Sequence, residues 1–157
     1  MDGAGILPIA YLDKELYFLF GLEREFGTWS DFGGGKYKHE NNIDTASREG
    51  SEELNGFFGS SDDIKKLINN NTLVTISSDK YITYVVLINF DKNLPYYFNN
   101  NYKCIKLHEP QILKKEGLYE KSMIRWFSKT DIVKEKDTFR EFYREELLPQ
   151  IFKYFNI

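Results

Sequence analysis

Five segments of the chain have the hydrophobic pattern of β-strands. They are short runs of aliphatic, β-branched and aromatic residues separated by polar turn residues. The predicted strands are Gly5–Ala10, Leu16–Leu22, Thr72–Ser77, Tyr81–Phe90 and Met123–Phe127. Polar turns at Asp13–Lys14 and Ser77–Lys80 lie between neighbouring strands, so they predict two hairpins.

Two segments outside the strands predict helices on different grounds. Asp62–Asn69 follows Ser60 and Ser61, and either serine can cap the first turn. Asp137–Phe155 repeats aromatic and aliphatic residues at helical spacing, which predicts an amphipathic helix. Pro149 lies inside that pattern and predicts a kink or a split, because proline donates no backbone hydrogen bond.

Residues 91–119 have neither pattern. Pro95, Pro110 and the run Asn99–Asn101 predict a long loop there. The order of strands and helices over residues 1–157 predicts one α+β domain, and 157 residues can bury a substantial core.

The composition is that of an ordinary globular protein, with 41% hydrophobic and 29% charged residues. Cys104 is the only cysteine, which excludes an internal disulfide and favours a reducing compartment. The sequence has no membrane-spanning run, and the N-terminal apolar run has no basic segment before it. We therefore expect no membrane association and a cytoplasmic location, in a cell or in an infected host cell.

The net charge of −3 is unevenly distributed. Residues 1–60 hold five Lys/Arg against eleven Asp/Glu, whereas residues 61–157 hold sixteen against thirteen. The most basic stretch, Lys103–Lys136, can offer countercharge to a phosphorylated substrate, or its lysines can be ordinary solvated surface.

The acidic half contains a dense set of charges at fixed spacing. Thr45–Leu54 predicts a helix, because Asn41 is a good N-cap and Asp44 completes a capping-box-like pair. Glutamates at i, i+3 and i+4 share one face of such a helix, and like charges at that spacing repel each other. These glutamates are Glu49, Glu52 and Glu53. Arg48 offsets part of the repulsion, and Mg2+ or Mn2+, which prefer oxygen ligands, can offset the rest. The alternative is a solvated acidic face.

Three consecutive glycines, Gly33, Gly34 and Gly35, precede this helix. They predict a turn in which the backbone can approach a ligand closely. A loop that leads into a helix N-terminus also favours anions, which predicts that the three glycines bind a phosphate.

The stretch from Gly34 through Glu40 and Arg48 to Glu53 resembles the Nudix box, G-x5-E-x7-R-E-U-x-E-E-x-G-U, where U is a bulky aliphatic residue. The resemblance implies an α/β/α sandwich with a mixed β-sheet. It also implies that Glu49, Glu52 and Glu53 and the carbonyl of Gly34 ligate divalent metal, that Arg48 orients the glutamates, and that Glu40 is structural or a secondary ligand. The sequence departs from the box at Gly50, Asn55 and Gly56, and Phe32 replaces a frequent proline.

By the same resemblance, a water molecule attacks the diphosphate, and four residues compete to be its base. They are Glu52 and Glu53 in the box, and Glu116 and Glu120 in the loop before the last strand. Arg24 lies where the family often places a phosphate-binding residue, and its alternative is a surface ion pair with Glu23 or Glu25.

The resemblance implies a metal-dependent pyrophosphohydrolase that cleaves a nucleoside diphosphate linked to another group. Small nucleotides are the favoured substrates, ahead of capped RNA and diphosphoinositol polyphosphates, because an acidic chain of this length leaves little room for an RNA-binding channel. A non-catalytic nucleotide-binding module of the same fold is the alternative from a different class, although such modules usually lack box glutamates. The resemblance is also compatible with a homodimer.

Overall fold

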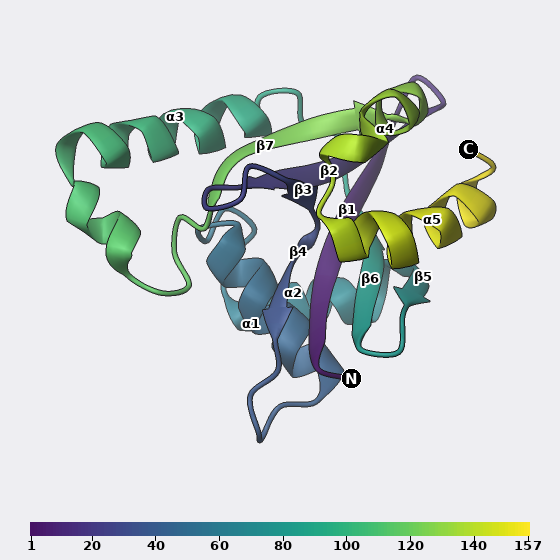
Figure 1. Cartoon of the computed structure of the whole chain (residues 1–157), viewed down its shortest axis with the longest axis horizontal. Coiled ribbons are helices and arrows are strands. Elements are labelled where there is room, and N and C mark those ends of the chain that lie inside the picture. Colours follow the sequence, from purple (N-terminus) through teal and green to yellow (C-terminus); the bar gives the residue numbers. More distant parts are fainter.

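The N-terminal hairpin forms the centre of the β-sheet (Figure 1). β1 (Gly3–Leu12) and β2 (Glu15–Glu23) pair antiparallel around Asp13 and Lys14, which both have positive φ. Positive φ at both central residues of a two-residue turn matches the twist of the strands that it joins. The computed structural model, which describes residues 1–157, therefore confirms the predicted first hairpin.

β1 organises the rest of the sheet. Its first half pairs antiparallel with β4 (Phe32–Gly35) and parallel with β6 (Tyr81–Leu87). β5 (Thr72–Ser77) continues beyond β6, so the second predicted hairpin is also confirmed. β2 pairs with β3 (Trp29–Ser30) and with β7 (Lys121–Ser128). The sheet is mixed, as expected.

Helices cover both faces of this sheet (Figure 1). On one side lie α1 (Asn42–Glu53), α2 (Ser61–Asn71) and α3 (Leu94–His108). On the other side lie α4 (Lys129–Glu135), α5 (Leu148–Phe155) and the π-helical segment η3 (Tyr143–Leu147). Short 3-10 segments, η1 (Pro110–Lys114) and η2 (Lys136–Thr138), complete the fold. None of the helices is both long and apolar enough to cross a membrane.

The sheet separates two hydrophobic clusters, which makes the predicted α/β/α sandwich. Leu7, Phe18 and Phe20 point from the sheet toward Tyr143 and Ile151 of the C-terminal helical region. The second cluster packs the opposite face of β1 and β2 against α1, α2 and α3. It includes Ala4, Ile6, Leu19, Ala46, Ile64 and Phe98. Alternation along the strands sends neighbouring side chains to opposite faces, so each strand serves both clusters.

The prediction of a loop over residues 91–119 was wrong, because fifteen of these residues form α3. Pro95 lies in the first turn, where its missing N–H costs no helical hydrogen bond. Asn99 points inward: its amide donates to the carbonyl of Ile124 and accepts from the Ile124 N–H. Tertiary contacts with β7 therefore stabilise a segment whose composition suggests a loop.

The predicted start of the last helix, at Asp137, was wrong. Lys136–Thr138 is a 3-10 turn and Phe139 bridges to Trp29, so the helix begins at residue 141. The disruption expected at Pro149 is present as η3, the π-helical segment immediately before α5. The strand predicted to end at Phe90 ends at Leu87, and α4 was missed.

Candidate active site

The helix that carries the glutamates is α1; its cap at Asn41 is as predicted, but the helix begins at Asn42, three residues before the predicted start at Thr45. Asn41 accepts from the Asp44 N–H and the Asp44 carboxylate accepts from the Asn41 N–H, which forms a complete capping box. After the helix, Asn55 takes positive φ, as expected for a residue that replaces the box glycine.

Gly50 occupies a position where the box has a bulky aliphatic residue, and close packing explains it. A Cβ built on Gly50 would lie 3.0 Å from the nearest side-chain atom of Ile6 and 3.3 Å from that of Ile64. The glycine therefore lets α1 approach β1 and α2 more closely than a larger residue would allow.

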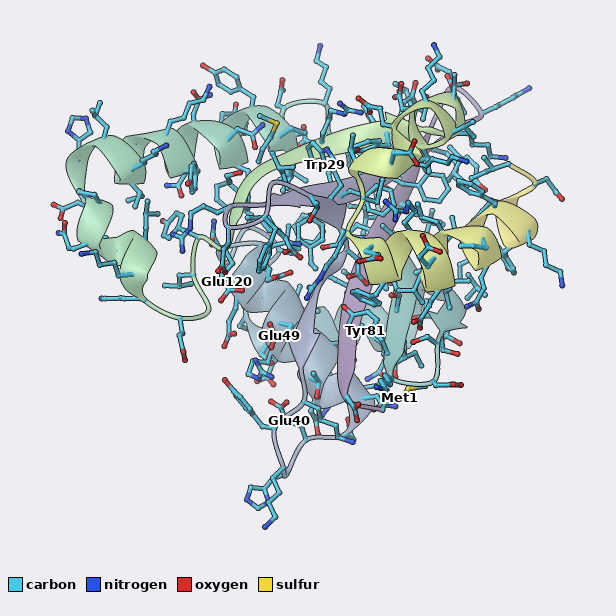
Figure 2. All side chains as sticks on the ribbon, viewed as in Figure 1. Met1, Trp29, Glu40, Glu49, Tyr81 and Glu120 are labelled. Atoms are coloured by element: carbon cyan, nitrogen blue, oxygen red, sulfur yellow. The ribbon has the colours of Figure 1, made fainter.

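Arg48 holds three of the glutamates in place. Its Nε lies 2.6 Å from Glu40 Oε1, and its Nη1 lies 2.6 Å from Glu49 Oε1 and 3.3 Å from Glu52 Oε2. Its Nη2 also donates to the Gly35 carbonyl. Hydrogen bonds from Arg48 lower the pKa of Glu40 to about 2, so this carboxylate stays ionised. Figure 2 shows Glu40, Glu49 and Glu120 along the same side of the molecule.

Glu53 points inward from the same helix and is buried. Its Oε2 accepts a 2.8 Å hydrogen bond from the Gly33 N–H and lies 3.7 Å from Lys121 Nζ. Burial raises the pKa of Glu53 to about 8, although Lys121 opposes the shift, and Glu49 is among the carboxylates that raise it further. Burial likewise raises the pKa of Glu49. The helix face therefore has an excess of negative charge in a poorly hydrated position.

The prediction that the three glycines form a turn was wrong, because Gly33, Gly34 and Gly35 lie in β4 and pair with β1. None of them has positive φ. Glycine is required at two of these positions because neighbouring side chains approach the backbone closely. A Cβ on Gly33 would lie 1.9 Å from Tyr81 Oη, and a Cβ on Gly34 would lie 2.6 Å from the Glu49 carboxyl group.

A cavity of about 280 Å³ lies beside Glu53. The backbone of Gly33 and Gly34 forms one wall, and Glu23, Glu25 and Glu120 contribute three further carboxylates. Two cationic residues, Arg24 and Arg140, line the same cavity. The arrangement places carboxylates that can ligate a cation next to guanidinium groups that can bind phosphate.

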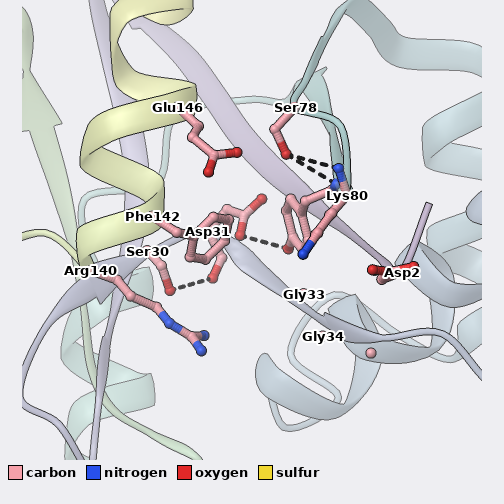
Figure 3. Close-up of a pocket in the computed structure, with 13 residues that line it drawn as sticks. Asp2, Ser30, Asp31, Gly33, Gly34, Ser78, Lys80, Arg140, Phe142 and Glu146 are labelled. Carbon is pink, nitrogen blue, oxygen red and sulfur yellow. Dashed lines mark hydrogen bonds between the residues drawn. The ribbon is translucent and has the colours of Figure 1, made fainter.

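A second cavity, of about 440 Å³, lies on the other side of Gly33 and Gly34 (Figure 3). Arg140 lines both cavities. The second cavity also presents the aromatic rings of Tyr81 and Phe142, which pack edge to face with centroids 5.4 Å apart. Gly33 and Gly34 are thus shared by the cavity beside Glu53 and by a second cavity that has both charged residues and an aromatic wall.

No protein-family model matches the chain, and no curated protein matches its sequence. Solved structures do match. A Nudix hydrolase from M. Smegmatis, RenU, superposes with a TM-score of 0.51 at 11% identity, covering 100% of this chain and 88% of that one. This chain has the Nudix fold.

Two further Nudix-fold neighbours have similarly low identity. The Ap4A hydrolase of C. elegans, in a binary complex, has a TM-score of 0.52 and 15% identity over 84% of this chain and 83% of that chain. A bifunctional NMN adenylyltransferase/ADP ribose pyrophosphatase from Francisella tularensis has a TM-score of 0.55 and 15% identity. That match covers 98% of this chain and 42% of the longer protein.

The two candidate glutamates of the loop before β7, Glu120 and Glu116, differ in their position relative to the cavity. Glu120 lines the cavity beside Glu53, whereas Glu116 is exposed and lies outside the cavity wall. Glu120 accepts from the Gly117 N–H, and a Cβ on Gly117 would lie 3.0 Å from Glu52 Oε2. The loop before β7 therefore rests against Glu52 and directs Glu120 toward the cavity.

Arg24 makes neither of the ion pairs considered for it. Its Nη1 donates to the carbonyl of Leu113 at 2.6 Å, and its N–H donates to the carbonyl of Glu120. Arg24 therefore ties β2 to the segment that carries Glu120 while it lines the cavity.

Sequence reasoning missed four residues beside the Nudix box. Lys121 is buried, Asp31 and Tyr81 line the second cavity, and Arg140 lines both cavities. Asp31 accepts from Tyr81 Oη and Thr83 Oγ1, and burial raises the pKa of Asp31 to about 6. A charged residue between Ser30 and Phe32, in the short hydrophobic segment that links β3 to β4, was a usable signal for Asp31. No residue near Lys121 in the sequence indicates its role, because its position beside Glu53 depends on the pairing of β7 with β2.

The donor chemistry of the box fits a hard divalent cation. Glu49, Glu52 and Glu53 offer carboxylate oxygens, and burial together with mutual repulsion raises the pKa values of Glu49 and Glu53. No three carboxylates form a ready-made ligand set, because Arg48 binds Glu49 and Glu52 while Gly33 binds Glu53. A cation would therefore have to compete with Arg48 for Glu49.

Proposed function

We propose that this protein is a metal-dependent pyrophosphohydrolase that cleaves the diphosphate linkage of a nucleoside diphosphate joined to a second group. The observation that carries the proposal is that Glu53, the buried glutamate of the box, lines the cavity. Glu53 lines that cavity with Glu120, and the guanidinium-bearing residues Arg24 and Arg140 face them. Carboxylates for a cation beside cationic groups for phosphate suit phosphoanhydride hydrolysis.

Glu49, Glu52 and Glu53, with the carbonyl of Gly34, would hold Mg2+ or Mn2+. The bound cation would acidify a water molecule and neutralise charge on the diphosphate. Arg48 keeps Glu49 and Glu52 oriented through its ion pairs, and the Gly33 N–H fixes Glu53. These contacts restrict the carboxylates before substrate binds.

Glu120 is our candidate for the proton acceptor. It lies in the wall of the cavity that Glu53 lines, and the Gly117 N–H orients its carboxylate at 3.1 Å. Glu52 and Glu53 would be occupied as metal ligands. Glu116 is the weaker candidate, because it does not line the cavity.

The second cavity is suited to the nucleoside. Tyr81 and Phe142 provide aromatic surface for a base, and Arg140 can bind a phosphate that crosses from one cavity to the other. Gly33 and Gly34 leave the crossing free of side chains. The C. elegans neighbour is an Ap4A hydrolase, and the Francisella tularensis neighbour includes an ADP ribose pyrophosphatase. Their descriptions support a small nucleotide as the first substrate to test.

The test is product analysis over a substrate panel with Mg2+ and with Mn2+. The panel holds nucleoside triphosphates, ADP-ribose, NADH, dinucleoside polyphosphates, capped RNA and an inositol pyrophosphate. We expect one class to be cleaved at its diphosphate linkage far faster than the others, with no turnover in EDTA.

Two variants make the test specific to the box. Glu52→Gln/Glu53→Gln should lose activity by at least about 10²-fold with its circular dichroism spectrum retained. Glu145→Gln, on the exposed surface, should behave like the wild type. Full activity in the double variant would refute the metal site. Nucleotide binding without turnover by the wild-type protein would favour the non-catalytic binding module.

A further inference from the structure

The segment that the sequence pattern assigns to a loop forms an arm beside the cavity of Glu53. α3 packs Phe98 against Phe57, just after the box helix, and Trp126 Nε1 donates to the Asp91 carbonyl before α3 begins. After α3, η1 contacts Arg24 through the Leu113 carbonyl. The same segment then continues to Glu120 in the cavity wall. The chain therefore leads from α3 through η1 to the wall of the cavity, and Figure 1 shows the path of this segment from α3 to β7.

This arm is basic although the chain as a whole is acidic. Residues 91–119 contain five lysines against three acidic residues, Asp91, Glu109 and Glu116, which gives a net charge of +2, whereas the whole chain has a net charge of −3. The five lysines are all exposed, and none forms an ion pair with a carboxylate. They are Lys92, Lys103, Lys106, Lys114 and Lys115. Unpaired cations on one arm create a local positive potential that attracts a polyanion.

The same arm exposes aromatic and apolar side chains. Tyr96 and Tyr97 are 66% and 57% exposed, and their rings lie 5.6 Å apart. Leu107, near the other end of the helix, is 75% exposed. Tyr96, Lys103 and Leu107 recur at intervals of seven and four residues, so they form one stripe along α3. Lysines that follow exposed aromatic rings along one helix provide phosphate contacts beside surfaces on which bases stack.

We infer that the outer face of α3 binds the single-stranded body of an RNA substrate whose 5′-terminal polyphosphate linkage enters the cavity. The inference rests on the proposed function and replaces the small nucleotide ranked first there with an RNA, because the basic arm supplies the RNA-binding surface that the net charge of the chain argued against. Tyrosine rings favour nucleic acid over an acidic protein, because bases stack on them. A single strand is favoured over a duplex, because bases must be unpaired to stack on side chains.

The first experiment measures binding without catalysis. A fluorescent, uncapped 20-nucleotide single-stranded RNA is titrated with the full chain in EDTA at several salt concentrations. Lys103→Glu/Lys106→Glu should weaken binding by at least about tenfold and reduce the slope of log K against log salt by about 1.4. Tyr96→Ser/Tyr97→Ser should weaken it by about fivefold or more with little change in slope.

Matched controls separate this face from general electrostatics. Lys134→Glu/Lys153→Glu makes the same charge change at exposed positions on α4 and α5, and Tyr154→Ser removes an exposed tyrosine from α5. Both control variants should bind RNA within about twofold of the wild type. Equal loss in the α3 and control variants would overturn the inference. Tighter binding of single-stranded DNA, or of polyglutamate, would also overturn it.

The second experiment connects binding to turnover. The substrates are a free cap dinucleotide and the same cap on a 20-nucleotide RNA. In Lys103→Glu/Lys106→Glu, kcat/KM for capped RNA should fall by at least about tenfold while kcat/KM for the dinucleotide stays unchanged. The inference would be overturned if the variant and the wild type had the same kcat/KM for capped RNA as well as for the dinucleotide. Absence of all hydrolysis by wild-type protein, with RNA bound through α3, would instead refute the proposed function alone.

Discussion

Lys121 Nζ lies 3.7 Å from Glu53 Oε2, and their side chains are only 1% and 6% exposed. Lys121 also lies 3.7 Å from Glu23 Oε1 and donates to Ser30 Oγ. It passes over Gly21, where an added Cβ would lie 2.8 Å from Lys121 Cδ. A buried cation thus supports the innermost carboxylate of the box from beneath, on the side opposite the cavity.

Removing that cation should destabilise the protein strongly. In Lys121→Met, Glu53 loses the buried cation that opposes the rise in its pKa, and above pH 8, where Glu53 is ionised in the wild type, we expect the free energy of unfolding in EDTA to fall by about 3–5 kcal/mol. Urea denaturation measures the change. Lys121→Met/Glu53→Gln should recover much of the loss, because it removes both members of the pair. Unchanged stability in the single variant would show that the pair contributes nothing.

Arg48 should matter for activity through the glutamates that it orients. Arg48→Ala removes the ion pairs to Glu40, Glu49 and Glu52. We expect kcat/KM to fall by about 10- to 100-fold, and a higher Mg2+ concentration to be needed for half-maximal activity. Arg48→Lys should not restore activity, because an ammonium group lacks the forked geometry that reaches several carboxylates.

Arg144→Ala is the control for Arg48, because Arg144 pairs only with exposed Glu145. It should change stability by less than about 1 kcal/mol and leave Mg2+ dependence unchanged. Equal Mg2+ titration curves for Arg48→Ala and the wild type would contradict the positioning role.

The glycines of β4 should differ sharply in their tolerance of alanine. Gly33→Ala would bring Cβ to 1.9 Å from Tyr81 Oη and 2.5 Å from Gly5 Cα, so we expect destabilisation of at least about 1–3 kcal/mol. A Cβ added at Gly35 would have no atom within 4 Å, so Gly35→Ala should leave the midpoint of thermal unfolding nearly unchanged. Thermal unfolding compares the two variants directly, and equal midpoints would contradict the close approach at Gly33.

Asp31 should make stability depend on pH. Its pKa is raised to about 6 from an ordinary 3.8, so its protonated form is favoured by folding. That stabilisation is complete below pH 3.8 and is lost as the pH rises through 6, a change of about 3 kcal/mol. Thr83, Lys121 and Tyr81 moderate the shift, and Glu23 adds to it.

Asp31→Asn removes this titration and should therefore alter the pH profile. Relative to the wild type, the variant should gain about 3 kcal/mol in free energy of unfolding between pH 4 and pH 8. Urea denaturation at four pH values measures the difference. A difference that does not change with pH would show that Asp31 has an ordinary pKa in the folded protein.

Local spacing was enough to predict the box helix and the strands around it. Asn41 and Asp44 mark the helix start, and a helical period alone puts Glu49, Glu52 and Glu53 on one face. These features involve residues within about two turns of one another. The Nudix fold itself was also accessible, because the box resemblance and the strand order agreed with each other.

The sequence failed where long-range packing overrides local composition. Asn99 reads as a loop residue, yet its amide pairs with the backbone of Ile124 and supports α3. Gly33–Gly35 read as a turn, yet β1 pairs with them and makes them a strand.

The sequence by itself determined the identity and order of the candidate metal-ligating residues in the box. Only the tertiary structure decided what surrounds them. The register between β2 and β7 pairs Glu23 with Lys121, and so brings a cation to Glu53 from a position 68 residues away along the chain. The packing of α3 decided that five lysines lie on an arm beside the cavity. The physical reason is that helix spacing depends on backbone geometry within a few residues, whereas these proximities depend on strand register and packing between distant segments.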